Sequence, residues 1–279
     1  MVIDAHQHFW RFDPVRDAWI TEEMSAIWRD FLPADLAAEL DSNGVDATIA
    51  VQADQSEAET EFLLGLAEGN RRIAGVVGWL DLRSAQIEKR LEHFAKFSKL
   101  RGLRHVAQAE PDERFLVGPD FVRGVACLKR FQLAYDILIH PRQLPAAIEL
   151  VGKLPEQRFV VDHLAKPGMN ATRVEPWASQ IRELAANPNV CCKISGLVTE
   201  GDWKSWKAAD FEPYLDVVFE AFGAERLMFG SDWPVCLVAA TYAQVKSTIE
   251  FYVDRHAAHA KSAIFGDNAQ RFYQTQLHV

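Results

Sequence analysis

Short apolar runs alternate with longer amphipathic stretches along the whole chain of 279 residues. The runs are rich in Val, Ile and Leu and lack polar alternation, which is typical of parallel strands covered on both faces. This pattern predicts eight buried strands. They are expected at residues 2–5, 47–51, 73–80, 100–106, 134–139, 158–162, 190–194 and 227–230.

The stretches between these runs have helical patterns. Residues 33–43 have a proline near their start and end before Gly44, which is the usual asymmetry of helix ends. Further helices are expected at 56–69, 84–98, 119–131, 142–152, 173–187, 203–222 and 241–255, with a C-terminal piece at 260–274. Eight strand–helix units predict an α/β fold, a single (β/α)8 TIM-barrel domain over residues 1–279. An open doubly wound sheet is the alternative, but no Gly-x-Gly-x-x-Gly follows the first strand, which weakens its dinucleotide-binding form.

Composition narrows the class of partner. The net charge is −9, and an acidic surface argues against nucleic acid or an anionic membrane as the main partner. No apolar run is long enough to span a bilayer, and the first strand begins without a signal-peptide pattern. The four cysteines include no C-x-x-C pair, which favours reduced thiols. We therefore expect a cytoplasmic protein that acts on a small molecule.

Five of the nine histidines fall at or just after the carboxyl end of a predicted strand, the end that carries the active site in a TIM barrel. They are His6, His8, His105, His140 and His163. His6 and His8 are two residues apart, so both imidazoles are expected on the inner face of the first strand. Such a pair can bind a metal or polarise a substrate oxygen. A pair of satisfied core histidines is the weaker alternative.

Asp232 ends the apolar run on the eighth strand. A carboxylate at such a place is costly unless something pairs with it, and facing two imidazoles it can bind a metal or take the proton from an attacking water. A helix-capping aspartate is the alternative. His163 and Lys166 follow the sixth strand abruptly, which suits a secondary catalytic role. His140, after the fifth strand, is either a third ligand or a loop histidine.

Several polar and aromatic residues near these strand ends are candidates for binding substrate. Arg104 or Lys193 is expected to hold a substrate oxygen, with a rim salt bridge as the alternative for Arg104. Trp19 and Trp233 can stack on a sugar-like ring, or they line the rim or a homo-oligomer contact instead. The predicted substrate-binding set is Gln52, Arg104, His105, Lys193, Trp19 and Trp233.

Together these motifs resemble the amidohydrolase superfamily. The resemblance rests on the segments 6–8, 162–167, 230–234 and 264–269, and it covers nearly the whole chain. Within the superfamily, residues 3–10 and 102–105 are similar to those of barrel hydrolases that open sugar lactones, the L-fuconolactonases among them.

The resemblance implies a role for each matching residue. His6, His8, His140 and Asp232 would be metal ligands, and Asp232 would also be the base that activates water. His163 and Arg104 would assist in catalysis. No Lys or Glu ends the fourth strand to bridge two metals, so we expect one divalent metal, zinc, or none, as in some lactonases.

The predicted reaction is hydrolysis of a sugar lactone to its aldonate. One alternative is a metal-dependent decarboxylase of aromatic or unsaturated acids on the same scaffold. A non-catalytic sugar-binding barrel is another, but it would leave a buried Asp232 and Lys193 unexplained.

Overall fold

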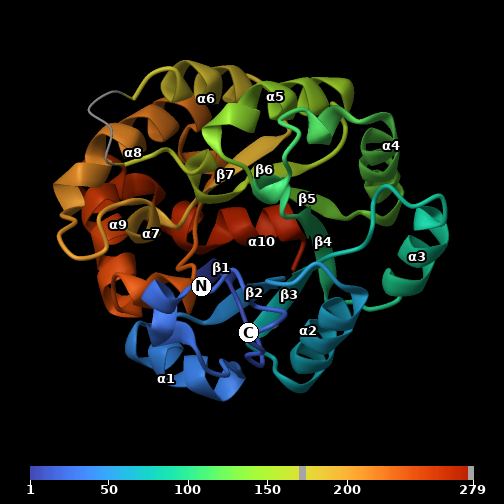
Figure 1. Cartoon of the computed structure of the whole chain (residues 1–279). Helices are drawn as coiled ribbons and strands as arrows, with labels where there is room; N and C mark the ends of the chain where they lie inside the picture. Colours follow the sequence, from blue (N-terminus) through green and yellow to red (C-terminus); the bar gives the residue numbers. More distant parts are fainter. Residues whose placement is uncertain (170–173, 276–279) are drawn as a thin grey trace.

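The computed structural model describes residues 1–169 and 174–275, and it is a (β/α)8 barrel, as predicted (Figure 1). Eight parallel strands pair in sequence order. They are β1 (Ile3–Gln7), β2 (Ala47–Val51), β3 (Ile73–Gly78), β4 (Leu100–His105), β5 (Ala134–Ile137), β6 (Phe159–Val161), β7 (Val190–Ile194) and β8 (Leu227–Phe229). The ring closes just beyond β8, where the His8 N–H donates to the Trp233 carbonyl at 2.7 Å.

Helices surround the strands, and most lie where the sequence predicts them (Figure 1). They are α1 (Pro33–Ser42), α2 (Glu57–Gly69), α3 (Ile87–Phe94), α4 (Pro119–Leu128), α5 (Leu144–Lys153), α6 (Trp177–Ala185), α8 (Ala208–Phe222) and α9 (Tyr242–His256). A short helix after β7, α7 (Leu197–Glu200), was not predicted. Residue 173, the predicted start of α6, lies outside the described residues. Across the described ranges, no helix is both long and apolar enough to cross a membrane.

The inside of the barrel is filled below its mouth. Small and branched side chains from the strands form an apolar cluster there, and Phe272 and Tyr273 of α10 (Asn268–Tyr273) belong to the same cluster. The Tyr273 hydroxyl donates to Asp136 Oδ2 on β5 at 2.7 Å. The barrel is therefore a packed core, and only its mouth is free to hold a ligand.

Candidate active site at the mouth of the barrel

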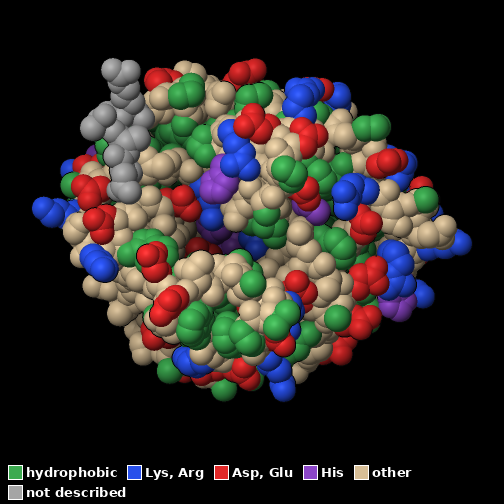
Figure 2. Space-filling view, in the orientation of Figure 1, with side chains coloured by type: hydrophobic (Ala, Val, Ile, Leu, Met, Phe, Trp, Pro, Cys, Tyr) green, Lys and Arg blue, Asp and Glu red, His purple; other side chains and the backbone are tan. Residues whose placement is uncertain are grey.

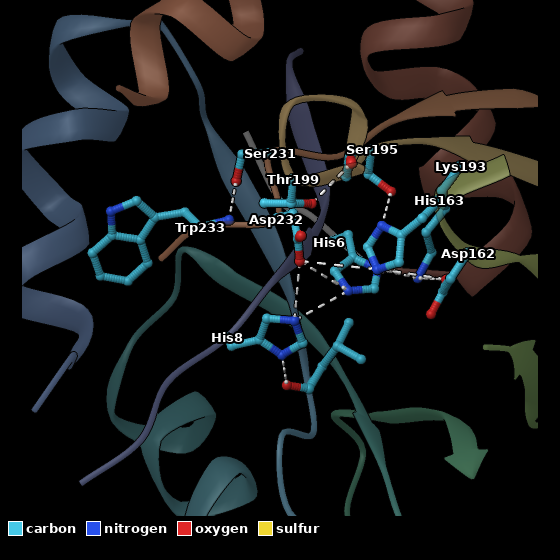
Figure 3. A network of polar contacts seen from close by, with 12 residues as sticks. His6, His8, Asp162, His163, Lys193, Ser195, Thr199, Ser231, Asp232 and Trp233 are labelled. Atoms are coloured by element: carbon cyan, nitrogen blue, oxygen red, sulfur yellow. Dashed lines mark hydrogen bonds and ion pairs between the residues drawn. The ribbon is translucent and has the colours of Figure 1, made fainter. Parts of the chain in front are cut away.

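Three histidines and one aspartate converge at the carboxyl ends of the strands (Figure 3). His6 Nε2 and His8 Nε2 lie 3.2 Å apart. Asp232 Oδ1 lies 3.7 Å from His6 Nε2 and 3.4 Å from His8 Nε2. His163 Nε2 is 3.9 Å from the same oxygen. The structure thus brings together the four residues on which the sequence prediction rests most heavily.

An irregularity in β1 aims the two histidines inward. Ile3 and Ala5 belong to the cluster inside the barrel, so plain alternation would place His6 on the outer face. The pairing with β2 instead shifts between Asp4 and Gln7. These two residues are three positions apart on β1, but the residues of β2 that pair with them are only two positions apart. A bulge of this kind re-aims the side chains that follow it. The spacing of the histidines predicted their common face, but not this change of face.

The backbone around the site is held in an uncommon conformation. Seven non-glycine residues of the described ranges have a positive φ, and five of them are Asp232 and the four residues 163–166. The left-handed conformation costs such residues roughly 1–2 kcal/mol each, and it persists where the surrounding structure imposes it. Gly196 allows the close packing, because a Cβ there would lie 2.7 Å from His163 Nδ1. Ser195 Oγ, 2.8 Å from the same nitrogen, fixes the ring.

A layer of buried charges lies directly beneath the imidazoles. Asp162 Oδ2 accepts from Arg104 at 3.0 Å, and Asp162 Oδ1 forms an ion pair with Lys193 Nζ at 3.0 Å. Lys193 also donates to Asp136 at 2.6 Å. His6 Nδ1 faces this layer, 3.5 Å from Asp162 Oδ1 and 3.2 Å from Lys193 Nζ. Two cations thus balance two carboxylates where unpaired charge would be very costly.

Burial sets the protonation states of the cluster. It lowers the pKa of His6 well below its ordinary value and lowers the pKa of His163 to about 4, so both rings are neutral at pH 7. Burial alone would raise the pKa of Asp232, but the surrounding imidazoles more than offset this and hold that pKa below its usual range. The cluster therefore presents an ionised carboxylate beside the neutral imidazoles of His6 and His163.

The donor set fits a single metal ion. With bonds of about 2.0–2.2 Å, the ligand atoms of a tetrahedral zinc lie roughly 3.3–3.5 Å apart. The spacings among His6, His8 and Asp232 are 3.2, 3.4 and 3.7 Å. A second possible set, His6 with Asp162 and His163, uses a carboxylate that already binds two cations. His140 belongs to neither set, and its backbone N–H begins a turn by donating to Gln143 Oε1.

A cavity of about 360 Å³ opens above the cluster. Figure 2 shows this hollow near the centre of the face, with blue and purple side chains visible inside it. His8, His163, Asp232 and Arg104 lie at its floor. Trp19 also lines it and is 43% exposed, which places an aromatic ring at the opening.

Four residues of the predicted substrate-binding set do not line this cavity. His105 faces away from it, since its ring accepts from Trp79 Nε1 at 3.2 Å and pairs with Glu110. Trp233 is buried against Phe9 and Phe31. The other two act from below: Lys193 belongs to the charge layer, and Gln52 Oε1 accepts from Arg104 at 3.2 Å. These four positions point to supporting roles and not to substrate contact.

Two residues of the site were missed as functional candidates. Asp162 links Arg104, Lys193 and His6, but it is not among the candidates that the sequence predicted. Its signal was a carboxylate directly after an apolar strand, the same signal that identified Asp232. Ser195 follows β7 with no sequence feature that indicates its contact with His163.

Sequence comparisons give one consistent result. The model of the amidohydrolase family matches residues 3–275. The chain is 44% identical over 282 residues to an L-fucono-1,5-lactonase of Burkholderia multivorans, covering 97% of this chain and 95% of that protein. It is 37% identical over 276 residues to an L-fucono-1,5-lactonase of Burkholderia ambifaria, covering 98% and 95%.

Comparison of structures agrees with this result. A crystal structure of an amidohydrolase from Burkholderia multivorans with bound zinc superposes with a TM-score of 0.95 at 43% identity. The match covers 99% of this chain and 100% of that one. The 5-carboxyvanillate decarboxylase of Sphingomonas paucimobilis, with a TM-score of 0.67 at 16% identity, shares the fold.

Proposed function

Because this chain belongs to the amidohydrolase family, as its motifs predicted, we propose that it is an enzyme that hydrolyses a sugar 1,5-lactone to the open aldonate. L-fucono-1,5-lactone is the first substrate to try, since two full-length relatives carry that activity in their names. The observation that supports the proposal best is the convergence of Asp232, His8 and His163 at the floor of a cavity. The cavity has the size of a small-molecule site.

In this proposal Asp232 holds a water molecule by accepting a hydrogen bond from it. As the water oxygen bonds to the lactone carbonyl carbon, the carboxylate takes the proton. The carbonyl oxygen gains negative charge, and Arg104 at the cavity floor stabilises it, with His163 alongside. The bond between the carbonyl carbon and the ring oxygen then breaks. Asp232 returns the proton to that ring oxygen, which becomes a hydroxyl group, and the carboxylic acid formed releases its remaining proton to solvent to give the carboxylate.

Arg104 would stabilise that charge as a cation held in place at the cavity floor. Its guanidinium donates to Asp162, to the side chain of Gln52 and to the Gln52 backbone carbonyl. A terminal nitrogen also lies 3.2 Å from His6 Nε2, so contacts with three residues leave the guanidinium little freedom. A charge fixed in this way before the reaction is the most effective in stabilising developing charge. The supporting role of Gln52 follows from the same contacts.

His6, His8 and Asp232 would hold one divalent ion, and zinc suits two imidazoles and a carboxylate. Bound there, zinc would polarise the lactone carbonyl and favour ionisation of water. The metal content of the purified protein tests this set. We expect no more than one equivalent of zinc in the wild type and a large loss in His8→Gln, whereas His140→Gln should retain the wild-type content.

The substrate proposal is tested with a panel of lactones at near-neutral pH, followed by proton release in weak buffer. We expect acceleration of L-fucono-1,5-lactone opening over the spontaneous rate and a slower reaction with the 1,4-lactone of the same acid. Aromatic acids such as 5-carboxyvanillate serve as the comparison for the decarboxylase alternative, and no carbon dioxide should be released. Wild-type protein that leaves every spontaneous opening rate unchanged would refute the proposal.

A further inference from the structure

Lys166 reaches the cavity from a left-handed turn. Residues 163–166 have φ values of 53, 55, 57 and 50°, and the Lys166 N–H closes the turn on the His163 carbonyl at 2.7 Å. Residues three apart in so tight a turn lie on the same side. His163 and Lys166 both line the cavity, whereas Leu164 and Ala165 between them are fully buried. The conformation that fixes the catalytic histidine therefore also fixes Lys166.

Lys166 lies nearer the opening than the reacting groups do. Its side chain is 19% exposed, compared with 4% for Arg104 and 6% for Asp232. Its ammonium lies 3.3 Å from Oε1 of Glu200, at the end of α7, and the Glu200 side chain is 18% exposed. No step of the proposed hydrolysis uses this pair. It holds a charged, partly exposed acceptor beside a charged donor that lines the cavity.

A second polar group of the same cavity points to the same kind of ligand. Gln108 lines the cavity, and its Oε1 is buried without a hydrogen-bond partner among the described residues. An acceptor without a partner is costly, and this one meets a ligand donor in the cavity when the Gln108 side chain turns towards it. A hydroxyl group both donates and accepts, so a ligand with several hydroxyls would satisfy the Lys166–Glu200 pair and Gln108 together.

We propose that Lys166, held beside Glu200, binds the ring hydroxyls of the lactone and so determines the choice of sugar. Neighbouring hydroxyls would lie across the pair, one accepting from the ammonium and the other donating to the carboxylate. The inference rests on the proposed function for the identity of the ligand. A contact between Lys166 and the hydroxyls of a ligand does not depend on that function. Lys166 affects substrate binding, whereas Arg104 and Asp232 act at the reacting carbonyl.

Kinetics with two lactones separate this role from a purely structural one. L-fucono-1,5-lactone carries hydroxyls, and δ-valerolactone has the same ring without them. In Lys166→Met we expect KM for the sugar lactone to rise about 10- to 100-fold with little change in kcat, as loss of a hydrogen bond to a charged group predicts. The kcat/KM for δ-valerolactone should stay within about twofold, and Lys166→Arg should recover part of the loss.

Lys153→Met is the matched control, because Lys153 pairs with Glu149 at 2.8 Å far from the cavity lining. It should behave as the wild type with both lactones. If Lys166→Met lowers kcat/KM equally for both substrates, Lys166 only supports the fold of the turn, and the proposal is overturned. A fall in kcat alone would overturn it as well, because it would assign Lys166 to the chemical step.

Binding to the stable open acids tests the contact without turnover. By calorimetry, wild-type protein should bind L-fuconate more tightly than 5-hydroxypentanoate, and Lys166→Met should lose that preference. Equal weakening for both acids would show that Lys166 binds the carboxylate, which contradicts the proposal, as would a wild type that does not prefer the sugar acid. If the preference depends on Lys166 but no lactone is opened, the proposed hydrolysis fails and the hydroxyl contact stands.

Discussion

The floor and the opening of the cavity are built on different principles. At the floor, Arg104, Asp162 and Lys193 come from strands or their ends, are at most 4% exposed, and each pairs with a charge from another strand. Near the opening, Trp19 and Lys166 come from loops and are partly exposed. The barrel thus supports the floor with paired buried charges, while its loops supply the more exposed contacts that can vary with the substrate.

The largest effect is expected from breaking the charge layer of the floor. Lys193→Met leaves Asp136 and Asp162 without the ammonium that lies 2.6 and 3.0 Å from them. Removing one partner of a fully buried ion pair costs about 3–5 kcal/mol. Urea denaturation should show a loss of that size in the free energy of unfolding.

A second substitution sharpens this test. Asp136→Asn in the Lys193→Met background removes one of the unpaired charges, so part of the lost stability should return. Lys166→Met, at the opening, should change the free energy of unfolding much less. If Lys193→Met and Lys166→Met lower the free energy of unfolding equally, the stability of the floor depends no more on its charges than that of the opening does.

The next effect concerns catalysis at the floor. Arg104→Gln removes the guanidinium that would stabilise the charge on the lactone carbonyl oxygen, and loss of one such donor lowers kcat about 10²- to 10³-fold. KM should change little. Arg104→Lys keeps the charge but cannot reach Asp162 and Gln52 together, so it should remain well below wild type. Arg104→Gln with unchanged kcat would show that Arg104 only balances Asp162.

The smallest effect is expected at the opening. Trp19 lines the cavity and packs edge-on against Trp10, with ring centroids 5.9 Å apart. Trp19→Ala removes a surface on which a sugar ring can rest, so KM should rise roughly 2- to 10-fold without a change in kcat. Trp28→Ala, an exposed tryptophan outside the cavity lining, is the control. A loss of kcat in Trp19→Ala would show that the opening of the cavity also affects the chemical step, against the division between floor and opening.

The same division explains how much the sequence predicted. The strands and the residues at their ends follow from apolar runs, so the barrel and the meeting of His6, His8, His163 and Asp232 could be anticipated. The bulge in β1 could not, because it arises from pairing with β2. Lys193 was expected to touch substrate, yet its partners are Asp136 on β5 and Asp162 just after β6, and sequence does not show how deep a side chain lies.

The opening was harder to predict for a physical reason. Loops have no periodicity, so His140 and Trp233 could be placed near a strand end but not oriented, and the same holds for His105 at the last position of β4. Neighbouring structure then decides: Glu110 and Trp79 fix the ring of His105, and Phe9 and Phe31 bury Trp233. The left-handed turn of residues 163–166 contains no glycine, so local sequence gave no sign of it.

The proton transfer assigned to Asp232 is the central claim. The most direct measurement is the opening rate of L-fucono-1,5-lactone by wild type and by Asp232→Asn, with L-fuconate binding confirming that both cavities are intact. The account predicts that kcat falls at least about 10³-fold in Asp232→Asn, because the amide cannot take a proton from water, while L-fuconate still binds. An Asp232→Asn enzyme within tenfold of the wild-type kcat would contradict it.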